Sequence, residues 1–329
     1  MRRVHGTRPF LSPTGEVLPG SIAEAGYLRL GDLDQWVLIR GEDVGNPPLI
    51  VLHGGPGFPE TALLRYHNAS LEKIFTVVYW DQRGAGRSFY RDIPASSMTT
   101  EQFLADLDEL VDHVRLRLDR EQAAIFGHSW GSVLGPLYAA RHPEKVALYV
   151  GAAQIGDWPA AEAASYALAI AAAKRRRNRK ALRELRAIGP PPYDGRAVMT
   201  ERTWMQRLDG QLRPRAMLGI ARVALRAPDS SPFDLPRTMR GFRFSLDTMW
   251  PAVSTMDLTK EVPELQMPVF FFLGRKDHWV PPATSVAYFE ALSAPSKRLV
   301  WFEDSGHEMF ADEPAKFNAL MAELVRPLL

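Results

Sequence analysis

Apolar and polar positions alternate along the chain with two different periods, which predict strands and helices. Residues 27–30 and 35–39 alternate apolar with polar side chains around a Gly-Asp turn, as in a hairpin at the edge of a sheet. Short apolar runs predict strands buried on both faces, and they lie at residues 48–53, 75–80, 123–126, 146–150 and 268–273. A further strand is predicted at 298–302.

Other segments carry apolar residues at helical spacing. In residues 99–118 apolar side chains recur every three or four positions, and Thr99 is placed to cap the first turn. Further helices are predicted at residues 60–73, 131–141, 282–292 and 313–325. Strands that alternate with helices in this way predict an α/β fold with a mostly parallel, doubly wound sheet.

The alternation stops between residues 156 and 250. This stretch is rich in Ala, Arg and Pro and contains helical patterns, but no run typical of a buried strand. A chain of 329 residues is long enough for one large α/β domain that carries an inserted lid. We therefore expect an α/β core in two parts, 1–155 and 251–329, with a helical lid inserted at 156–250.

Charge is unevenly distributed between these parts. Residues 157–250 hold 18 Lys and Arg against 9 Asp and Glu, a sum of +9. The remainder holds 22 against 29, a sum of −7, and the two sums give the net charge of +2. We interpret the basic insertion, with its run at 174–180, as a solvated helical face. We expect no nucleic-acid partner.

The composition excludes several classes of site. The chain has no cysteine, so it forms no disulfide, no zinc–thiolate site and no cysteine nucleophile. The basic N-terminus is not followed by an apolar run of signal-peptide length, and no stretch approaches the ~20 apolar residues of a membrane span. We expect a cytoplasmic protein without a membrane partner, a metal or a cofactor. The sequence does not indicate the oligomeric state.

The strongest chemical signal is a G-x-S-x-G motif at residues 127–131. It follows the predicted strand 123–126 and opens the predicted helix 131–141. In this context the glycines allow a sharp turn that lifts the serine hydroxyl clear of the sheet. The motif predicts Ser129 as a catalytic nucleophile.

A serine nucleophile needs a histidine base within hydrogen-bond reach. On such a fold the chain order is serine, acid, histidine, and only His278 and His307 lie beyond the insertion. His307 follows the last predicted strand, at the carboxyl end of the sheet, where open α/β sheets build their sites. His278 directly follows the candidate acid and could not easily face it, so we favour His307.

The acid that orients the histidine should also follow a strand. Asp277 comes after the strand 268–273 through a Gly-Arg-Lys turn, and it is our candidate. It could instead cap a helix before Pro281. Asp157, after an earlier strand, is the alternative acid.

Two backbone donors are needed to bind the negative charge that develops on the substrate oxygen. One should come from Trp130, the residue after the nucleophile. The other should come from the glycine-rich loop 53–57, where Gly55 is our candidate, because glycine lets the backbone approach the substrate closely. His53 is interpreted as a structural residue that holds this loop.

Together these motifs resemble a known family. HGGPG (53–57), WDQRGAGRS (80–88), GHSWGS (127–132), GRKD (274–277) and SGH (305–307) occur in the order found in the prolyl iminopeptidase family of α/β-hydrolases. The resemblance implies an α/β-hydrolase fold and an active site composed of the triad Ser129, Asp277 and His307 with the oxyanion donors Gly55 and Trp130. The loop 81–88 is then structural.

The sequence also departs from the family. In the family, the turn that carries the serine more often begins Gly-Gly-Ser, whereas this chain has His128 at the middle position. After the HGGPG motif, Phe58 stands where a further glycine is usual. Peptidases of the family hold the substrate amine with carboxylates from the lid, whereas this lid is basic. Its acids match no motif and include Glu162, Glu184, Glu201, Asp209 and Asp247.

Two enzyme hypotheses follow for a small-molecule or short-peptide substrate. One is an aminopeptidase that releases N-terminal proline or a similar residue. The other is a carboxylic-ester hydrolase for a bulky ester or macrolactone, such as an antibiotic. A non-catalytic binding protein with this fold is a third hypothesis, which the intact triad pattern opposes. Aromatic residues near the motifs or in the insertion are candidate pocket residues: Phe58, Trp204, Trp250, Trp279 and Phe310.

Overall fold

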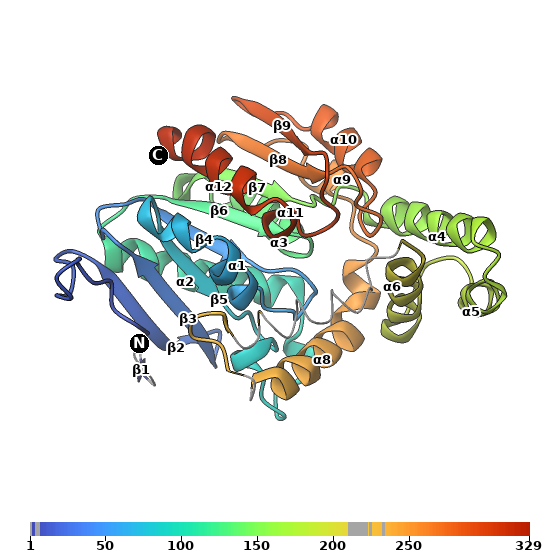
Figure 1. Ribbon diagram of the computed structural model, residues 1–329, viewed down its shortest axis with the longest axis horizontal. Coiled ribbons are helices and arrows are strands. Elements are labelled where there is room, and N and C mark those ends of the chain that lie inside the picture. The colour runs from blue at the N-terminus through green and yellow to red at the C-terminus, as the bar shows by residue number, and fades with distance from the viewer. Residues whose placement is uncertain (1, 4–6, 210–222, 224–225, 232–233) are drawn as a thin grey trace.

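A single sheet forms the centre of the protein (Figure 1). The computed structural model describes residues 2–3, 7–209, 223, 226–231 and 234–329. Nine strands among these residues pair in the order β1-β2-β3-β5-β4-β6-β7-β8-β9. They are β1 (Arg2–Arg3), β2 (Ile22–Leu30), β3 (Leu33–Gly41), β4 (Pro48–Leu52), β5 (Thr76–Trp80), β6 (Ala123–His128), β7 (Val146–Ala152), β8 (Val269–Gly274) and β9 (Lys297–Phe302).

The pairing confirms the predicted, mostly parallel sheet. All neighbouring strands from β5 to β9 in the sheet are parallel, and the hairpin of β2 and β3 joins β5 in antiparallel pairing. The central strand β4 is buried along its whole length, as its continuous apolar run predicts. The carboxyl ends of the parallel strands meet at one edge, where the predicted site residues follow their strands.

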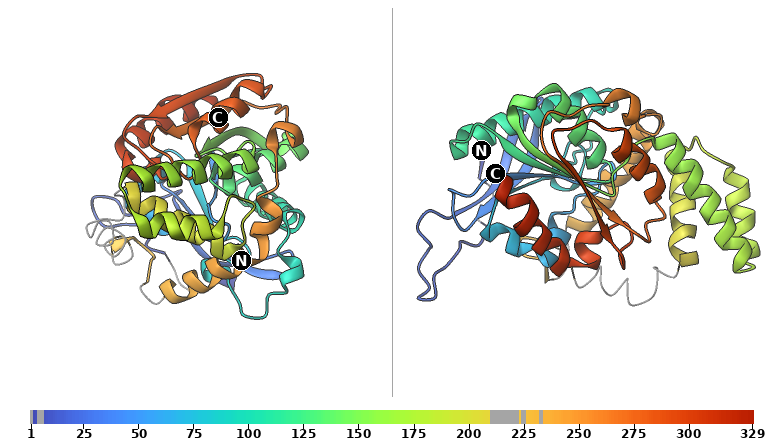
Figure 2. Two further views of the ribbon diagram at one scale, coloured as in Figure 1. Left: turned by 90° about the vertical axis from the view of Figure 1, so that its right-hand side faces the viewer. Right: turned by 90° about the horizontal axis from the view of Figure 1, so that it is seen from above.

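Helices cover both faces of the sheet (Figure 2). The helices α2 (Thr100–Leu118), α3 (Gly131–Arg141) and α10 (Pro282–Ala291) pack on one face. The helices α1 (Thr61–His67), α11 (Met309–Asp312) and α12 (Pro314–Leu320) pack on the other. Thr99 caps α2 as predicted, because its side chain accepts a hydrogen bond from the Gln102 N–H. None of the described helices combines the length and the apolar character that crossing a bilayer requires.

The predicted helix over residues 60–73 is interrupted. Helix α1 ends at His67, and a separate 3-10 turn spans Ala69–Lys73. The break allows Glu72 in this turn to accept hydrogen bonds of 2.8 Å from both Arg40 and Arg65 in the protein interior. A buried carboxylate needs such partners, so tertiary contacts override local helical spacing here.

The described residues of the insertion between β7 and β8 form helices joined by turns and loops. It contains α4 (Trp158–Arg175), α5 (Arg179–Ile188), α6 (Gly195–Asp209), α8 (Leu235–Val253) and α9 (Leu258–Glu261). Helix α8 continues three residues past the predicted boundary at 250. Figure 1 shows α4, α5 and α6 projecting beyond one end of the sheet, with α8 lying below them.

Contacts place the insertion at the carboxyl ends of the strands. A Cβ on Gly57, after β4, would lie 2.5 Å from Ser245 Cβ in α8. The Ser245 hydroxyl donates to the carbonyl of Gly84, after β5, over 3.2 Å. On the other side, the Ser165 hydroxyl of α4 lies 2.7 Å from the His278 carbonyl oxygen, after β8.

The start and the end of the insertion are joined to each other. Asp157 and Asp257 form an isolated antiparallel bridge. On either side of it, Trp158 N–H donates to the Met256 carbonyl over 3.1 Å, and Leu258 N–H donates to the Gly156 carbonyl over 2.8 Å. The two segments that connect the insertion to the core therefore pair side by side as a short stalk.

Candidate active site

Ser129 stands in a strained turn at the end of β6. Its φ of +52° lies in the left-handed region, which non-glycine residues adopt mainly where the surrounding structure requires it. Both motif glycines are required by close packing. A Cβ on Gly127 would lie 2.3 Å from the Gly131 carbonyl oxygen, and one on Gly131 would lie 2.0 Å from that of Leu52. The tight turn leaves Ser129 partly exposed at the head of α3.

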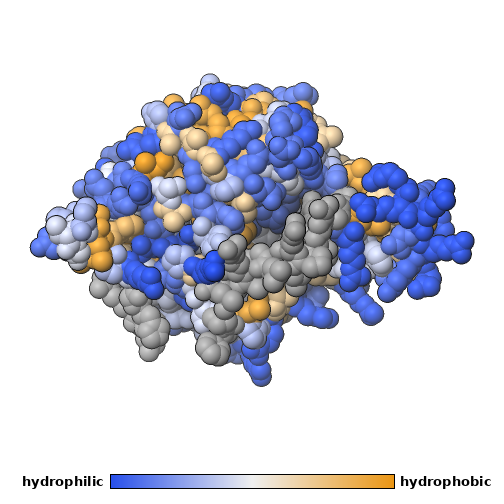
Figure 3. All heavy atoms as spheres, in the orientation of Figure 1, coloured by the Kyte–Doolittle hydropathy of each residue, from blue (hydrophilic) through white to orange (hydrophobic). Residues whose placement is uncertain are grey.

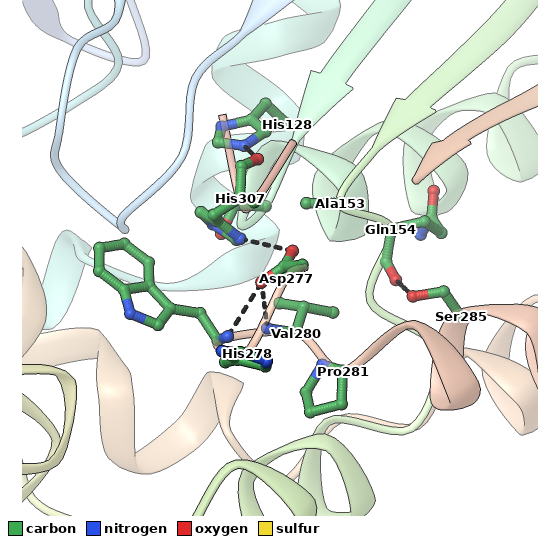
Figure 4. Close-up of polar contacts among 12 residues, drawn as sticks. His128, Ala153, Gln154, Asp277, His278, Val280, Pro281, Ser285 and His307 are labelled. Carbon is green, nitrogen blue, oxygen red and sulfur yellow. Dashed lines mark hydrogen bonds and ion pairs between the residues drawn. The ribbon is translucent and has the colours of Figure 1, made fainter. Parts of the chain in front are cut away.

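Asp277 and His307 form a buried hydrogen-bonded pair (Figure 4). His307 Nδ1 lies 2.8 Å from Asp277 Oδ2, and Asp277 Oδ1 accepts from the backbone N–H groups of Trp279 (2.9 Å) and Val280 (3.0 Å). Burial alone would raise the pKa of Asp277, but His307 and these two N–H groups outweigh it and lower the pKa. An ionised carboxylate that accepts from Nδ1–H leaves the other ring nitrogen free to take a proton.

The His307 loop and the Ser129 turn are in contact. The ring of His128, which precedes Ser129, lies 4.8 Å from the His307 ring between centroids. His128 Nε2 is 2.9 Å from the His307 carbonyl oxygen. The alternative acid, Asp157, instead caps α4 by accepting from the Ala160 N–H over 2.9 Å. The structure thus joins the predicted histidine to Asp277 and sets its loop against His128, the residue that precedes the predicted nucleophile.

The glycine-rich loop lies against the same turn. Gly55 has φ +117°, and a Cβ there would lie 2.5 Å from the Gly57 nitrogen, so only glycine fits. A Cβ on the preceding Gly54 would lie 3.2 Å from Ser129 Cβ. Trp130 is buried at the N-terminus of α3, and its indole N–H donates to Gln82 Oε1 over 2.9 Å. The roles of the Gly55 and Trp130 N–H groups as oxyanion donors stay predictions.

His53 holds this loop, as the sequence predicts. Its Nδ1 lies 2.8 Å from the Gly54 carbonyl oxygen, and its Nε2 accepts from the Gln82 N–H over 3.1 Å. Burial lowers the pKa of His53 to about 4, which keeps the ring neutral and suits a nitrogen that accepts. Gln82 therefore connects the loop 81–88 to both the glycine-rich loop and Trp130.

A second buried pair, Glu60 and His128, was not anticipated from the sequence. Glu60 Oε1 lies 2.6 Å from His128 Nδ1 and accepts from the Gly54 N–H over 3.2 Å. Burial alone would lower the pKa of His128, but the Glu60 carboxylate outweighs it and raises the pKa to about 9. The only sequence signal was the departure of His128 from the glycine that is usual at this position in the family.

This pair makes stability depend on pH above neutrality. The pKa of His128 is about 9 in the folded protein against an ordinary value of 6.5, so the folded state binds its proton more tightly. The resulting stabilisation is fully present below about pH 6.5 and is lost as the pH rises through about 9. We expect the difference in Tm between wild type and H128N to shrink over this range. Titratable groups that both proteins share contribute equally to both Tm values and so do not affect the difference. A Tm difference that stays constant from pH 6 to 10 would contradict the prediction.

The five candidate pocket aromatics occupy different environments. The Trp279 ring lies 5.0 Å from the His307 ring, and Phe58 is 43% exposed and packs edge-on against Phe242. Trp250 is buried edge-on against Trp158, which in turn lies 6.4 Å from Trp130. Trp204 is buried in a hydrophobic cluster within the insertion, and Phe310 is buried in the cluster between the sheet and α12, so their roles as pocket residues stay predictions.

The charges of the insertion include an exposed basic run and a buried cluster. The cations of the run 174–180 are exposed, and the surface at that end of the molecule is hydrophilic (Figure 3). Among the residues that the structure describes, Glu162, Glu201 and Arg202 form a largely buried cluster. Arg202 donates to Glu201 Oε2 over 2.7 Å and also to Glu162 Oε1. Two carboxylates and one guanidinium sum formally to −1, opposite in sign to the insertion as a whole.

The buried charges adjoin the candidate site and are incompletely paired. The Ser165 hydroxyl lies within hydrogen-bond distance of Glu201 Oε1 (2.9 Å) and of the carbonyl oxygen of His278 (2.7 Å), next to Asp277, and its one proton can be donated to either. Glu162 Oε2 is buried without a hydrogen-bond partner among the described residues. Burial raises the pKa of Glu162 although Arg202 opposes the shift.

A family model described as the alpha/beta hydrolase fold matches residues 47–314. The chain belongs to the α/β-hydrolase fold family. This α/β hydrolase is 30% identical over 309 residues to the "Probable aminopeptidase YbaC" of Bacillus subtilis, an alignment that covers 93% of this chain and 97% of that protein. It is 25% identical to a "Proline iminopeptidase" of Heyndrickxia coagulans over 87% of this chain and 93% of that one.

A solved structure with the same fold is that of a proline iminopeptidase-related protein from Thermus thermophilus. It superposes with a TM-score of 0.63 at 23% identity and covers 94% of this α/β hydrolase and 100% of that chain. At this identity the likeness shows the shared fold. The family match and the curated relatives confirm that the protein is a hydrolytic enzyme resembling the proline iminopeptidases.

Proposed function

We propose that this α/β hydrolase cleaves acyl bonds through a Ser129 acyl-enzyme. Ser129 Oγ attacks the acyl carbon while His307 Nε2 takes the hydroxyl proton, and Asp277 stabilises the imidazolium that forms. The N–H groups of Gly55 and Trp130 bind the developing oxyanion. His307 then gives the proton to the leaving group. In the second half of the reaction His307 takes a proton from water, the water oxygen attacks the acyl carbon, and His307 returns the proton to Ser129 Oγ as the acid product leaves. The observation that carries this proposal is the 2.8 Å Asp277–His307 bond beside the strained Ser129 turn.

We further propose that the preferred substrates carry a free amine next to the scissile acyl group. Desolvating an ammonium costs several kcal/mol unless carboxylates receive it. The basic run 174–180 faces solvent, where its charge is screened, so it does not oppose an ammonium in the site. The described cluster of Glu162, Glu201 and Arg202 sums formally to −1, and its Glu162 Oε2 accepts no hydrogen bond from the described residues. The names of the curated relatives support the same substrate class.

A substrate panel tests this assignment. We expect arylamides of free proline or alanine to be cleaved, and their N-acetylated counterparts to be cleaved far more slowly, because acetylation removes the ammonium. E162Q should raise KM for the free-amine substrates about 10- to 100-fold, the usual worth of a hydrogen bond to a charged group. E201Q is the matched control, because both Glu201 oxygens already have partners, and its effect on KM should be smaller.

An ester hydrolase is the second candidate, and Arg202 is the observation that favours it. Its guanidinium already binds both lid carboxylates, as a substrate ammonium would. In that case short p-nitrophenyl esters and lactones should be cleaved and free-amine arylamides should not. E162Q should then leave ester KM values unchanged.

A further inference from the structure

Three loops of the candidate site converge on Glu60 and His128. Glu60 precedes α1 and binds the Gly54 N–H of the glycine-rich loop over 3.2 Å. His128 is the last residue of β6, immediately before Ser129, and its Nε2 lies 2.9 Å from the backbone carbonyl oxygen of His307. Figure 4 shows the His128 ring set against the His307 backbone. A 2.6 Å bond between Glu60 Oε1 and His128 Nδ1 closes the chain of contacts.

The chemistry of the partners determines where the protons lie. A backbone carbonyl only accepts, so His128 Nε2 must carry a proton. The short contact between Nδ1 and the Glu60 carboxyl also holds a proton. The pair is therefore neutral as a whole whether this second proton lies on the ring or on the carboxyl, and neither polar group is buried with an uncompensated charge. Both side chains are at most 5% exposed.

We propose that Glu60 and His128 act as a positioning pair, which fixes the His307 backbone relative to Ser129 and the glycine-rich loop. The inference rests on the proposed function of His307 as the base. Asp277 orients the His307 ring from one side, but it does not hold the backbone from which the ring projects. The bond from His128 to the His307 carbonyl does so, and it starts from the residue adjacent to the nucleophile.

Two amide substitutions of His128 separate positioning from simple packing. In H128N the side-chain nitrogen occupies the place of Nδ1, so it keeps the bond to Glu60 and loses the bond to the His307 carbonyl. In H128Q the nitrogen occupies the place of Nε2, so it keeps the His307 bond and loses the Glu60 bond. Both variants lose the ring, whose edge contact with Phe310 has a centroid distance of 5.0 Å.

The two roles predict opposite orders of activity. H128Q leaves the buried Glu60 carboxylate with only the Gly54 N–H, so it should have the lower Tm of the two variants. If His128 positions His307, H128N should nevertheless lose more activity, with kcat reduced about 100-fold and KM changed less than about threefold. H128Q should retain kcat within about tenfold of wild type. The same pair of substitutions at His142, a half-exposed residue at the end of α3, is the control for histidine replacement.

The decisive experiment combines turnover with a readout that needs no substrate. Alongside kcat, KM and Tm, ¹H NMR follows the downfield resonance of the His307 Nδ1–H bound to Asp277. We expect this resonance to persist in H128Q and to shift or broaden in H128N. The positioning role would be overturned if H128Q, the variant with the lower Tm, also lost more activity than H128N. An unchanged resonance in H128N would overturn it as well. If the wild-type protein turned over no substrate, the proposed function would fail, but the resonance would still decide the role of His128.

Discussion

S129A is expected to lower kcat for any cleaved substrate by about 10⁴-fold or more, with little change in KM. Without the hydroxyl no acyl-enzyme can form, and members of a triad act as one unit in which a single loss removes most of the catalysis. The fold should persist, because alanine tolerates the φ of +52° about as well as serine does. Steady-state kinetics and labelling by a fluorophosphonate, which modifies activated serines, measure the effect.

The control for S129A is S96A, which removes an exposed hydroxyl and should leave kcat and labelling unchanged. H307A and S129A should not add when combined, because each alone disables the same unit. Turnover in S129A within tenfold of wild type would exclude Ser129 as nucleophile. A wild-type protein that binds ligands without turnover, and is not labelled, would support the non-catalytic hypothesis instead.

D277N is expected to reduce kcat by about 10⁴-fold while KM stays within a few-fold. The asparagine oxygen can still accept from Trp279 and Val280, so the local turn should survive. Its amide nitrogen, however, would face His307 Nδ1 as a donor and force the proton onto Nε2. That tautomer cannot take the serine proton.

D157N is the matched control for the acid. Asp157 caps α4, and asparagine is an equally good cap, so kcat and Tm should change little. The opposite result, near-normal turnover in D277N and collapse in D157N, would move the acid to the loop after β7. If kcat fell in both D277N and D157N, the cause would be a loss of folded protein, which a lower Tm in both variants would reveal.

Much of the fold could be predicted from single residues and local patterns. Thr99 marks the start of α2, and the apolar run at 48–53 becomes the buried strand β4, because buried parallel strands and capped helices depend on nearby residues. The interruption of the helix at 60–73 could not be predicted. It depends on Glu72 meeting Arg40, which is distant in sequence, and Arg65, which a continuous helix would hold two turns away and out of contact.

The candidate site divides in the same way. The pairing of Asp277 with His307 could be predicted from chain order and strand ends, since parallel strands bring their carboxyl ends to one edge. The Glu60–His128 pair and the partnership of Glu162 with Arg202 could not, because each joins helices or loops whose relative placement no local pattern encodes. For the same reason, the net charge of the insertion does not describe the charges in its interior. It sums surface cations and buried carboxylates that the fold separates.

The stalk at Asp157 and Asp257 has a consequence for how this enzyme can diversify. Its two segments leave and rejoin the core at neighbouring strands, β7 and β8, which pair directly. A polypeptide of another length or shape can therefore be grafted onto the stalk without altering strand register, since the cost of closing a longer loop rises only slowly. Ser129, Asp277 and His307 all lie outside that graft point. Under the proposed mechanism, the inserted helices can thus change while these three residues keep their positions in the core.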